Sequence, residues 1–218
     1  MVEVCPLPMI ADIDSGFGNV VTLMRAVRTF EALGTAGVHV EDMEVPRRCS
    51  TAEDNIVPGE EMAGRVKAAM SAKTDPDFVV IARTDVLPYH GLDAAIDRAN
   101  LYAEAGADMV YVEHLKTRAD MEAVAKRVSA PKLISLNKGS GKGKGDLLPA
   151  DALGEMGYKI LTLPADAQLA AIHNMKALLA HLKESGSTEN FDAMVTFPDR
   201  DALVGLADAR AIEEAFLP

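Results

Sequence analysis

The sequence predicts an α/β fold of the TIM (β/α)8 barrel type, with six strand–helix units in the chain. Short apolar runs alternate with amphipathic segments six times, which is typical of a parallel sheet covered by helices. A doubly wound sheet fits this alternation as well. However, polar residues follow nearly every apolar run, and only a barrel brings the carboxyl ends of all its strands to one mouth. The residues that favour the barrel are Asp12, Asp14, Glu41, Asp42, Arg83, Asp85, Glu113 and Asn137.

The expected strands are short and rich in Val, Ile and Leu, as buried parallel strands usually are. They cover residues 7–14, 37–42, 78–85, 109–113, 132–136 and 158–163. Apolar residues at helical spacing predict helices over residues 19–33, 59–72, 92–105, 117–128, 149–156, 165–183 and 199–215. Asn19 is expected to cap the first helix and Gly34 to end it.

The composition is that of a globular protein and argues against several classes of partner. The 218 residues carry a formal net charge of −11 and include no Trp, which disfavours nucleic-acid and anionic-membrane surfaces. No apolar run could span a bilayer and no signal-peptide layout is present, so we expect a cytoplasmic protein in which Cys5 and Cys49 are free thiols. A small anionic substrate fits the composition, because a metal ion or a few Arg residues reverse the potential inside a pocket.

The first strand ends in two carboxylates, Asp12 and Asp14, which would point to the same side of an extended chain. Two such acids repel each other unless a cation, a proton or a basic partner lies between them. Together with Glu41 at the end of the next strand, they form a set of oxygen ligands that Mg²⁺ prefers, and Mn²⁺ would also fit. Each acid alone is equally well explained by helix capping or a turn. The three together favour a metal site.

Four further features carry candidate chemistry, and each has a structural alternative. Cys49 follows Arg47 and Arg48, whose charges favour a reactive thiolate, but the same loop also fits an exposed basic turn. Arg83 ends a buried strand and therefore either pairs with a neighbouring acid or binds a carboxylate bidentately. Glu113 presents the same choice. The Gly- and Lys-rich loop 137–145 is either a flap over an anionic ligand or a solvated connection.

Several motifs together resemble the isocitrate lyase/phosphoenolpyruvate mutase superfamily, in its 2-methylisocitrate lyase-like branch. The resemblance covers essentially the whole chain and is most specific in the first two motifs and in the Cys loop. The motifs are Ala11-Asp-Ile-Asp-Ser-Gly-Phe-Gly-Asn19, Ala36-Gly-Val-His-Val-Glu-Asp42, Arg47-Arg-Cys49, Ile81-Ala-Arg-Thr-Asp85, Ala103-Glu-Ala-Gly-Ala-Asp108, Val112-Glu113 and Gly157-Tyr-Lys159.

The resemblance implies site roles for residues that the pattern alone leaves open. It implies a Mg²⁺ ion near Asp12, Asp14 and Glu41 that chelates a 2-oxo acid or its enolate. It further implies that Cys49 exchanges a proton with the departing carbanion and that Arg83 stabilises the 2-oxo acid. The implied catalytic residues are Cys49, Arg83 and Glu113, and the implied substrate-binding residues are Gly18, Arg48, Arg83, Glu113 and Asn137.

The function implied by the resemblance is a Mg²⁺-dependent carbon–carbon lyase. It would cleave a small 2-hydroxy di- or tricarboxylate, such as 2-methylisocitrate, to a 2-oxo acid and a dicarboxylate. One alternative is an oxaloacetate hydrolase or decarboxylase, which needs the same metal chemistry. Another is an inactive homologue that binds a 2-oxo acid, because Ser50 and Thr51 stand where the family has Gly and His.

The resemblance also implies how the chain is organised. Residues 1–184 would form a barrel domain that lacks the first two strand–helix units of the family. Residues 185–218 would form a C-terminal helical extension that packs on, or swaps with, a neighbouring subunit. The open edge at strand 7–14 would be a liability in a monomer. We therefore expect either a shortened chain or a sheet completed between subunits, and a homo-oligomer, either a dimer or a tetramer.

Overall fold

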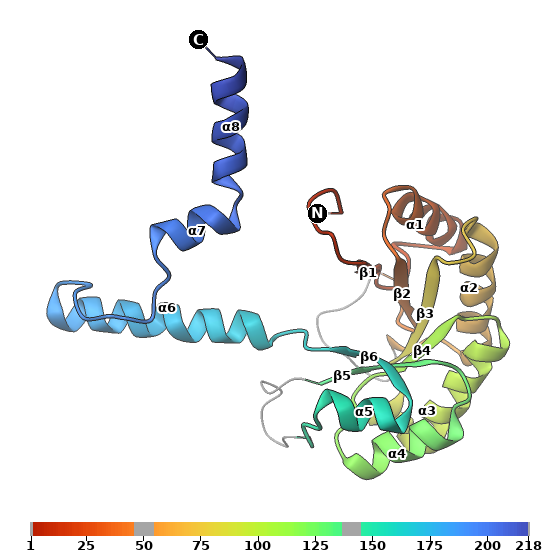
Figure 1. Cartoon of the computed structure of the whole chain (residues 1–218). Coiled ribbons are helices and arrows are strands. Elements are labelled where there is room, and N and C mark those ends of the chain that lie inside the picture. Colours follow the sequence, from red (N-terminus) through yellow and green to blue (C-terminus); the bar gives the residue numbers. More distant parts are fainter. Residues whose placement is uncertain (1, 46–54, 137–144, 218) are drawn as a thin grey trace. The chain divides into compact units, whose positions relative to one another are not determined.

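The computed structural model describes residues 2–45, 55–136 and 145–217, and the chain divides into two units, Met1–Ala165 and Asp166–Pro218. The first unit contains a six-stranded parallel sheet in which each strand pairs with the next one along the chain (Figure 1). The strands are β1 (Ile10–Asp12), β2 (Gly37–Glu41), β3 (Val79–Thr84), β4 (Met109–Val112), β5 (Lys132–Ser135) and β6 (Tyr158–Thr162).

Five helices of the first unit lie along the outer side of the curved sheet (Figure 1). They are α1 (Val20–Ala32), α2 (Gly59–Ala72), α3 (Leu87–Glu104), α4 (Arg118–Arg127) and α5 (Ala150–Met156). Among the described residues, β1 and β6 are the two edges of the sheet, so the sheet forms a half-barrel. The predicted count of six strands and the barrel-type fold are therefore confirmed.

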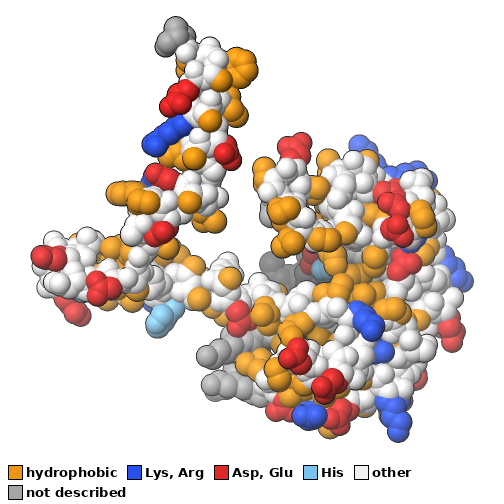
Figure 2. All heavy atoms as spheres, viewed as in Figure 1, with side chains coloured by type: hydrophobic (Ala, Val, Ile, Leu, Met, Phe, Trp, Pro, Cys, Tyr) orange, Lys and Arg blue, Asp and Glu red, His pale blue; other side chains and the backbone are white. Residues whose placement is uncertain are grey.

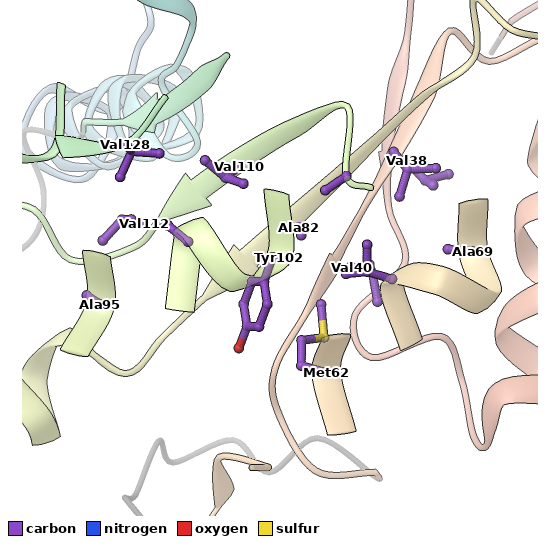
Figure 3. Packing of buried hydrophobic residues seen from close by; sticks show 14 of the residues in the cluster. Val38, Val40, Met62, Ala69, Ala82, Ala95, Tyr102, Val110, Val112 and Val128 are labelled. Atoms are coloured by element: carbon purple, nitrogen blue, oxygen red, sulfur yellow. The ribbon is translucent and has the colours of Figure 1, made fainter. Parts of the chain in front are cut away.

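The two faces of the sheet carry different residues because successive side chains of a strand alternate between faces. Side chains such as Val38, Val40 and Ala82 pack with Met62 and Tyr102 in the main core beneath the helices (Figure 3). The opposite face holds a smaller apolar cluster of Ile81, Met109, Tyr111 and Leu133. In the register of the sheet, Glu41 lies beside Arg83 and Arg83 lies beside Tyr111. Glu41 and Arg83 thus reach the second face at the carboxyl ends of β2 and β3, an edge of the sheet that we call the mouth.

Some boundaries differ from the prediction because glycines and turns interrupt the pattern. The first strand ends at Asp12, since Asp14 has a left-handed backbone with φ 47°, so the two acids do not share one extended segment as predicted. The predicted helix over residues 92–105 begins earlier, at Leu87, and is kinked at Gly91. The cap at Asn19 is confirmed, because its side-chain oxygen accepts hydrogen bonds from the backbone N–H groups of two residues of the first helical turn.

The second unit is helical and contains α6 (Asp166–Ser185), α7 (Phe197–Leu203) and α8 (Leu206–Phe216). A predicted single helix over residues 199–215 is divided at Gly205, whose φ is 65°. No described residue of this unit is buried, and Figure 2 shows apolar side chains on the surface of its helices. The second unit begins at Asp166. The predicted C-terminal extension over residues 185–218, which would pack on a neighbouring subunit, stays a prediction.

None of the helices within the described ranges has the length and apolar character needed to cross a membrane.

Candidate functional site

The carboxyl ends of β1 and β2 bring Asp12, Asp14 and Glu41 together at the mouth. The Asp14 N–H donates a hydrogen bond to Asp12 Oδ1 at 2.9 Å, which closes a tight turn directly after the strand. The Glu41 N–H in turn donates to the Asp14 carbonyl at 2.9 Å and ties the two strand ends together. A left-handed non-glycine residue such as Asp14 costs conformational energy, and such residues cluster at functional sites.

These acids differ in burial and in the charges that surround them. The Asp12 side chain is 48% exposed, and its Oδ1 lies 3.6 Å from His39 Nδ1. Burial lowers the pKa of His39, while the negative charge of Asp12 acts in the opposite direction. Glu41 is fully buried, with its Oε2 atom 3.6 Å from Arg83 Nε. Of these two neighbours, Arg83 brings a positive charge to the acids, whereas the lowered pKa of His39 favours its neutral form.

The donor types present suit Mg²⁺, although they do not form a complete protein cage. Within the described parts of the chain, no three His, Cys, Asp or Glu side chains are arranged to hold a metal ion by themselves. Mg²⁺ commonly takes only one or two carboxylates directly and keeps several water ligands. The carboxylates of Asp12, Asp14 and Glu41 fit that requirement chemically, and their role as ligands stays a prediction.

Arg83, at the end of β3, is held by the carboxylate of Asp85. Arg83 Nε donates to Asp85 Oδ2 and Arg83 Nη2 donates to Asp85 Oδ1, each at 2.7 Å. The guanidinium also lies 5.2 Å from the centre of the Tyr111 ring, within range of a cation–π contact. The structural ion pair anticipated for Arg83 is present, so the side chain has a fixed position at the mouth.

The electrostatics of this pair keep both groups charged. Burial by itself raises the pKa of Asp85, but contacts with His114 and Arg83 outweigh burial and lower that pKa to about 2. Burial likewise opposes the charge of Arg83, whereas Asp85 and more distant acids raise its pKa well above its usual value. The cation of Arg83 is therefore permanent at any physiological pH.

Glu113 and His114 follow β4 at the same edge. Burial raises the pKa of Glu113, against the influence of Arg83, and its Oε2 atom has no hydrogen-bond partner among the described residues. His114, which the sequence analysis did not select, has a left-handed backbone with φ 68° and places Nε2 3.4 Å from Asp85 Oδ1. Its position directly after a strand-end acid is the signal that would have identified it.

A cavity of about 250 Å³ adjoins these residues at the ends of β4 and β5. Two of its walls come from residues at and after the ends of these strands, and the third comes from residues 145–147. The residues that line it are Glu113, His114, Leu115, Lys116, Ser135, Leu136, Gly145, Asp146 and Leu147. The cavity is open to Glu113, so it extends the candidate site beyond Arg83.

The remaining predicted site residues are placed only in part. Gly18 has a φ of 154°, and a Cβ atom there would lie 2.6 Å from Thr22 Oγ1, so the corner before α1 requires glycine. Its role in substrate binding stays a prediction. Arg48, Cys49 and Asn137 lie outside the described residues.

A buried polar network behind the mouth was also missed by the sequence analysis. Asp42, which follows β2, is fully buried, and its Oδ2 atom accepts hydrogen bonds from Arg98 at 3.0 Å and from Tyr102 at 2.8 Å. Both donors belong to α3. Their spacing of four residues on one helix was the only signal in the sequence.

Comparison with known families agrees with the arrangement of the strands. The family model described as phosphoenolpyruvate phosphomutase matches residues 1–183. The chain belongs to this family.

Its similarity to curated relatives places it in the 2-methylisocitrate lyase-like branch of the superfamily. It is 35% identical to 2,3-dimethylmalate lyase of Eubacterium barkeri, over 99% of this chain and 74% of that protein. It is 38% identical to probable 2-methylisocitrate lyase 1 of Corynebacterium glutamicum, over 87% of this chain and 62% of that protein. The chain thus spans about two thirds of the length of these relatives.

Solved structures of the superfamily share the fold. Phosphoenolpyruvate phosphomutase from Streptomyces platensis subsp. rosaceus matches 100% of this chain and 76% of its own, with a TM-score of 0.89 and 27% identity. Phosphonopyruvate hydrolase in complex with oxalate and Mg²⁺ matches 100% of this chain and 75% of its own, with a TM-score of 0.84 and 29% identity. Oxaloacetate acetylhydrolase in complex with oxalate matches 95% and 70%, with a TM-score of 0.83 and 27% identity.

Proposed function

We propose that this protein is a Mg²⁺-dependent carbon–carbon lyase that cleaves a small 2-hydroxy di- or tricarboxylate to a 2-oxo acid and a dicarboxylate. The observation that carries the proposal is the permanent, fixed cation of Arg83, which lies in one layer of the sheet with Glu41. Negative charge that develops on a 2-oxo oxygen is stabilised best by donors that are already in place. The relatives that are named as lyases support this reaction class.

In the proposed reaction, the substrate hydroxyl gives its proton to water as its oxygen becomes a carbonyl. The adjacent carbon–carbon bond breaks, and its electron pair passes to the carbon beside the other carboxylate, which then takes a proton. A bound Mg²⁺ would supply Lewis-acid stabilisation of the 2-oxo oxygen, held through Asp12, Asp14 and Glu41. Arg83 would bind and stabilise the same oxygen, and Cys49 would give the proton to the carbanion.

Glu113 would complete the substrate contacts together with Gly18, Arg48 and Asn137. Because burial raises the pKa of Glu113, its carboxyl group holds a proton more readily than an exposed glutamate does. A protonated carboxyl group can donate a hydrogen bond to a substrate carboxylate, whereas an ionised one would repel it. Glu113 would therefore orient an anionic substrate in the cavity beside β4 and β5.

The reaction class can be tested by measuring pyruvate or glyoxylate release from a panel of 2-hydroxy acids, with Mg²⁺ and with EDTA. We expect turnover only with Mg²⁺, and a loss of about tenfold or more in Cys49→Ser and in Arg83→Lys, because a lysine cannot reproduce the two parallel hydrogen bonds of Arg83. Arg127→Lys is the matched control, since Arg127 forms an exposed ion pair with Asp93 and does not line the cavity of the site. Turnover that survives EDTA would remove the metal from the proposal.

A second candidate, hydrolysis or decarboxylation of oxaloacetate, is favoured by the structural similarity to oxaloacetate acetylhydrolase. The same panel includes oxaloacetate, so release of oxalate and acetate, or of pyruvate alone, would identify it. Mg²⁺-dependent binding of oxalate without turnover of any acid would instead indicate a binding protein without catalytic activity.

We also propose that the protein is a homo-oligomer, either a dimer or a tetramer. The second unit buries none of its described residues, yet it carries large exposed apolar side chains such as Leu179 and Phe216. Apolar surface of this extent usually marks an interface. Sedimentation velocity over a range of concentrations tests this proposal, and a single monomeric species would contradict it.

A further inference from the structure

A fully buried carboxylate, Asp42, directly follows β2 and contacts both the end of β3 and the helical layer. Its backbone N–H donates to the Arg83 carbonyl at 3.2 Å. Its Oδ1 atom accepts a hydrogen bond from the Asp85 N–H at 2.9 Å. Asp42 therefore holds the backbone at Arg83 and at Asp85, the two residues that form the ion pair at the mouth.

The other oxygen of Asp42 is held from the helical layer. Oδ2 accepts hydrogen bonds from Arg98 Nη1 at 3.0 Å and from the Tyr102 hydroxyl at 2.8 Å. Arg98 Nη1 also donates to the Val57 carbonyl at 2.8 Å and lies 3.2 Å from the Tyr102 hydroxyl. A buried carboxylate is costly to place in a core unless it is paired in this way, so the position of Asp42 depends on α3. Figure 3 shows the Tyr102 ring in the core between α3 and the sheet.

These contacts form a continuous series from α3 to the mouth. Arg98 and Tyr102 fix the Asp42 carboxylate, Asp42 fixes the backbone of Asp85, and the Asp85 side chain grips both edges of the Arg83 guanidinium. Each member has little freedom of its own, because Asp42 and Asp85 are buried and Arg83 is enclosed between Asp85, Glu41 and Tyr111. The orientation of Arg83 thus depends in part on Asp42, Arg98 and Tyr102, which lie behind the mouth.

We propose that Asp42, Arg98 and Tyr102 are positioning residues that set the orientation of Arg83 through Asp85. This inference rests on the proposed function only in the part that concerns turnover, because the orientation of Arg83 can be measured without any substrate. A loosened network would leave Arg83 charged and at the mouth but less well aligned with a developing oxyanion. Turnover would then fall while substrate affinity changed little.

The experiment compares Tyr102→Phe with Tyr158→Phe, since each removes one buried phenol hydroxyl from the same unit. Tyr158 donates to the Met121 carbonyl at 2.9 Å and has no contact with the Arg83 network among the described residues. In protein labelled with ¹⁵N-arginine, the Nε–H signal of Arg83, assigned by its loss in Arg83→Lys, should exchange with water about fivefold faster or more in Tyr102→Phe and remain unchanged in Tyr158→Phe. Asp42→Asn should show a larger change.

Steady-state kinetics with the substrate that the protein turns over give a second readout. We expect kcat to fall about tenfold in Asp42→Asn and less in Tyr102→Phe, with KM within about twofold of the parent, and no change in Tyr158→Phe. If Asp42→Asn does not fold, Tyr102→Phe decides. If the parent protein turns over no acid, the lyase proposal fails, while the Arg83 signal still tests positioning. The inference would be overturned if the Arg83 Nε–H of Tyr102→Phe exchanged with water at the parent rate, while the stability of Tyr102→Phe fell as much as that of Tyr158→Phe.

Discussion

The two halves of the mouth differ in what holds their charged groups. The β3–β4 half consists of Arg83, Asp85, Glu113 and His114, and the β1–β2 half consists of Asp12, Asp14, His39 and Glu41. In the first half, a buried acid, Asp85, and a mostly buried base, Arg83, pair directly through two hydrogen bonds of 2.7 Å. In the second half, Asp12 Oδ1 lies 3.6 Å from His39 Nδ1, and the Asp12 side chain is 48% exposed.

This difference suggests that the two halves have different roles in stability and in cation binding. The β3–β4 half is fixed by partners within the protein, so its charges contribute to stability as well as to the site. The β1–β2 half collects acids at the edge of the sheet, where water and a cation can reach at least Asp12. Removing the buried charge of Asp85 should therefore destabilise the protein more than removing the half-exposed charge of Asp12.

The largest effect is expected for Asp85→Asn. Removing this charge leaves the Arg83 guanidinium in a mostly buried position without its main partner, which typically costs about 3–5 kcal/mol of the free energy of unfolding. Urea denaturation measures the loss. Asp93→Asn is the matched control, because its ion pair with Arg127 is exposed and should contribute less than about 1 kcal/mol. Equal losses in the two variants would show that burial does not distinguish the β3–β4 half.

A smaller loss of stability is expected at acidic pH. The pKa of Asp85 is about 2 in the folded protein, compared with about 3.9 in an unfolded chain. A lowered pKa contributes stability above the unfolded value, and that stability is lost as the pH falls from about 4 towards 2. The full contribution is about 2–3 kcal/mol, of which about half should be lost at pH 3.

The measurement that isolates Asp85 is the stability difference between the parent protein and Asp85→Asn at pH 5 and at pH 3. Carboxylates that do not interact with Asp85 titrate equally in both proteins and cancel. The difference should narrow as the pH falls. A difference that stays constant or widens would mean that Asp85 is not held in its ionised form by Arg83 and His114.

The sequence predicted the elements of the fold because they depend on local pattern. The six apolar runs became the six strands, and Asn19 caps α1 as expected, since these features arise from residues close in the chain. The polar ends of successive strands indicated Glu41 and Arg83 as neighbours, and their register confirms this. The kink at Gly91 and the division at Gly205 were missed, because each depends on one glycine within an otherwise helical pattern.

The parts of the site that were missed depend on tertiary contacts. Asp42 is separated from Arg98 by 56 residues and from Tyr102 by 60, so no local pattern connects them. On a helical wheel, Arg98 is read as a surface residue, whereas its head group turns inward to a buried acid. The tie between the turn at Asp14 and β2 likewise depends on a hydrogen bond from Glu41 on the next strand. Such partners become visible only when the sheet is assembled.

The smallest effect on stability is expected for Asp12→Asn, in the β1–β2 half. The asparagine oxygen can still accept the hydrogen bond from the Asp14 N–H, and the side chain is about half exposed, so the free energy of unfolding should change by no more than about 0.5 kcal/mol. Mg²⁺ binding in the presence of oxalate should nevertheless weaken by about tenfold or more, because the variant loses one anionic oxygen ligand. Calorimetric titration measures this loss. Unchanged Mg²⁺ affinity would exclude Asp12 from the metal site, whereas destabilisation as large as that of Asp85→Asn would show that both halves are held by internal pairing.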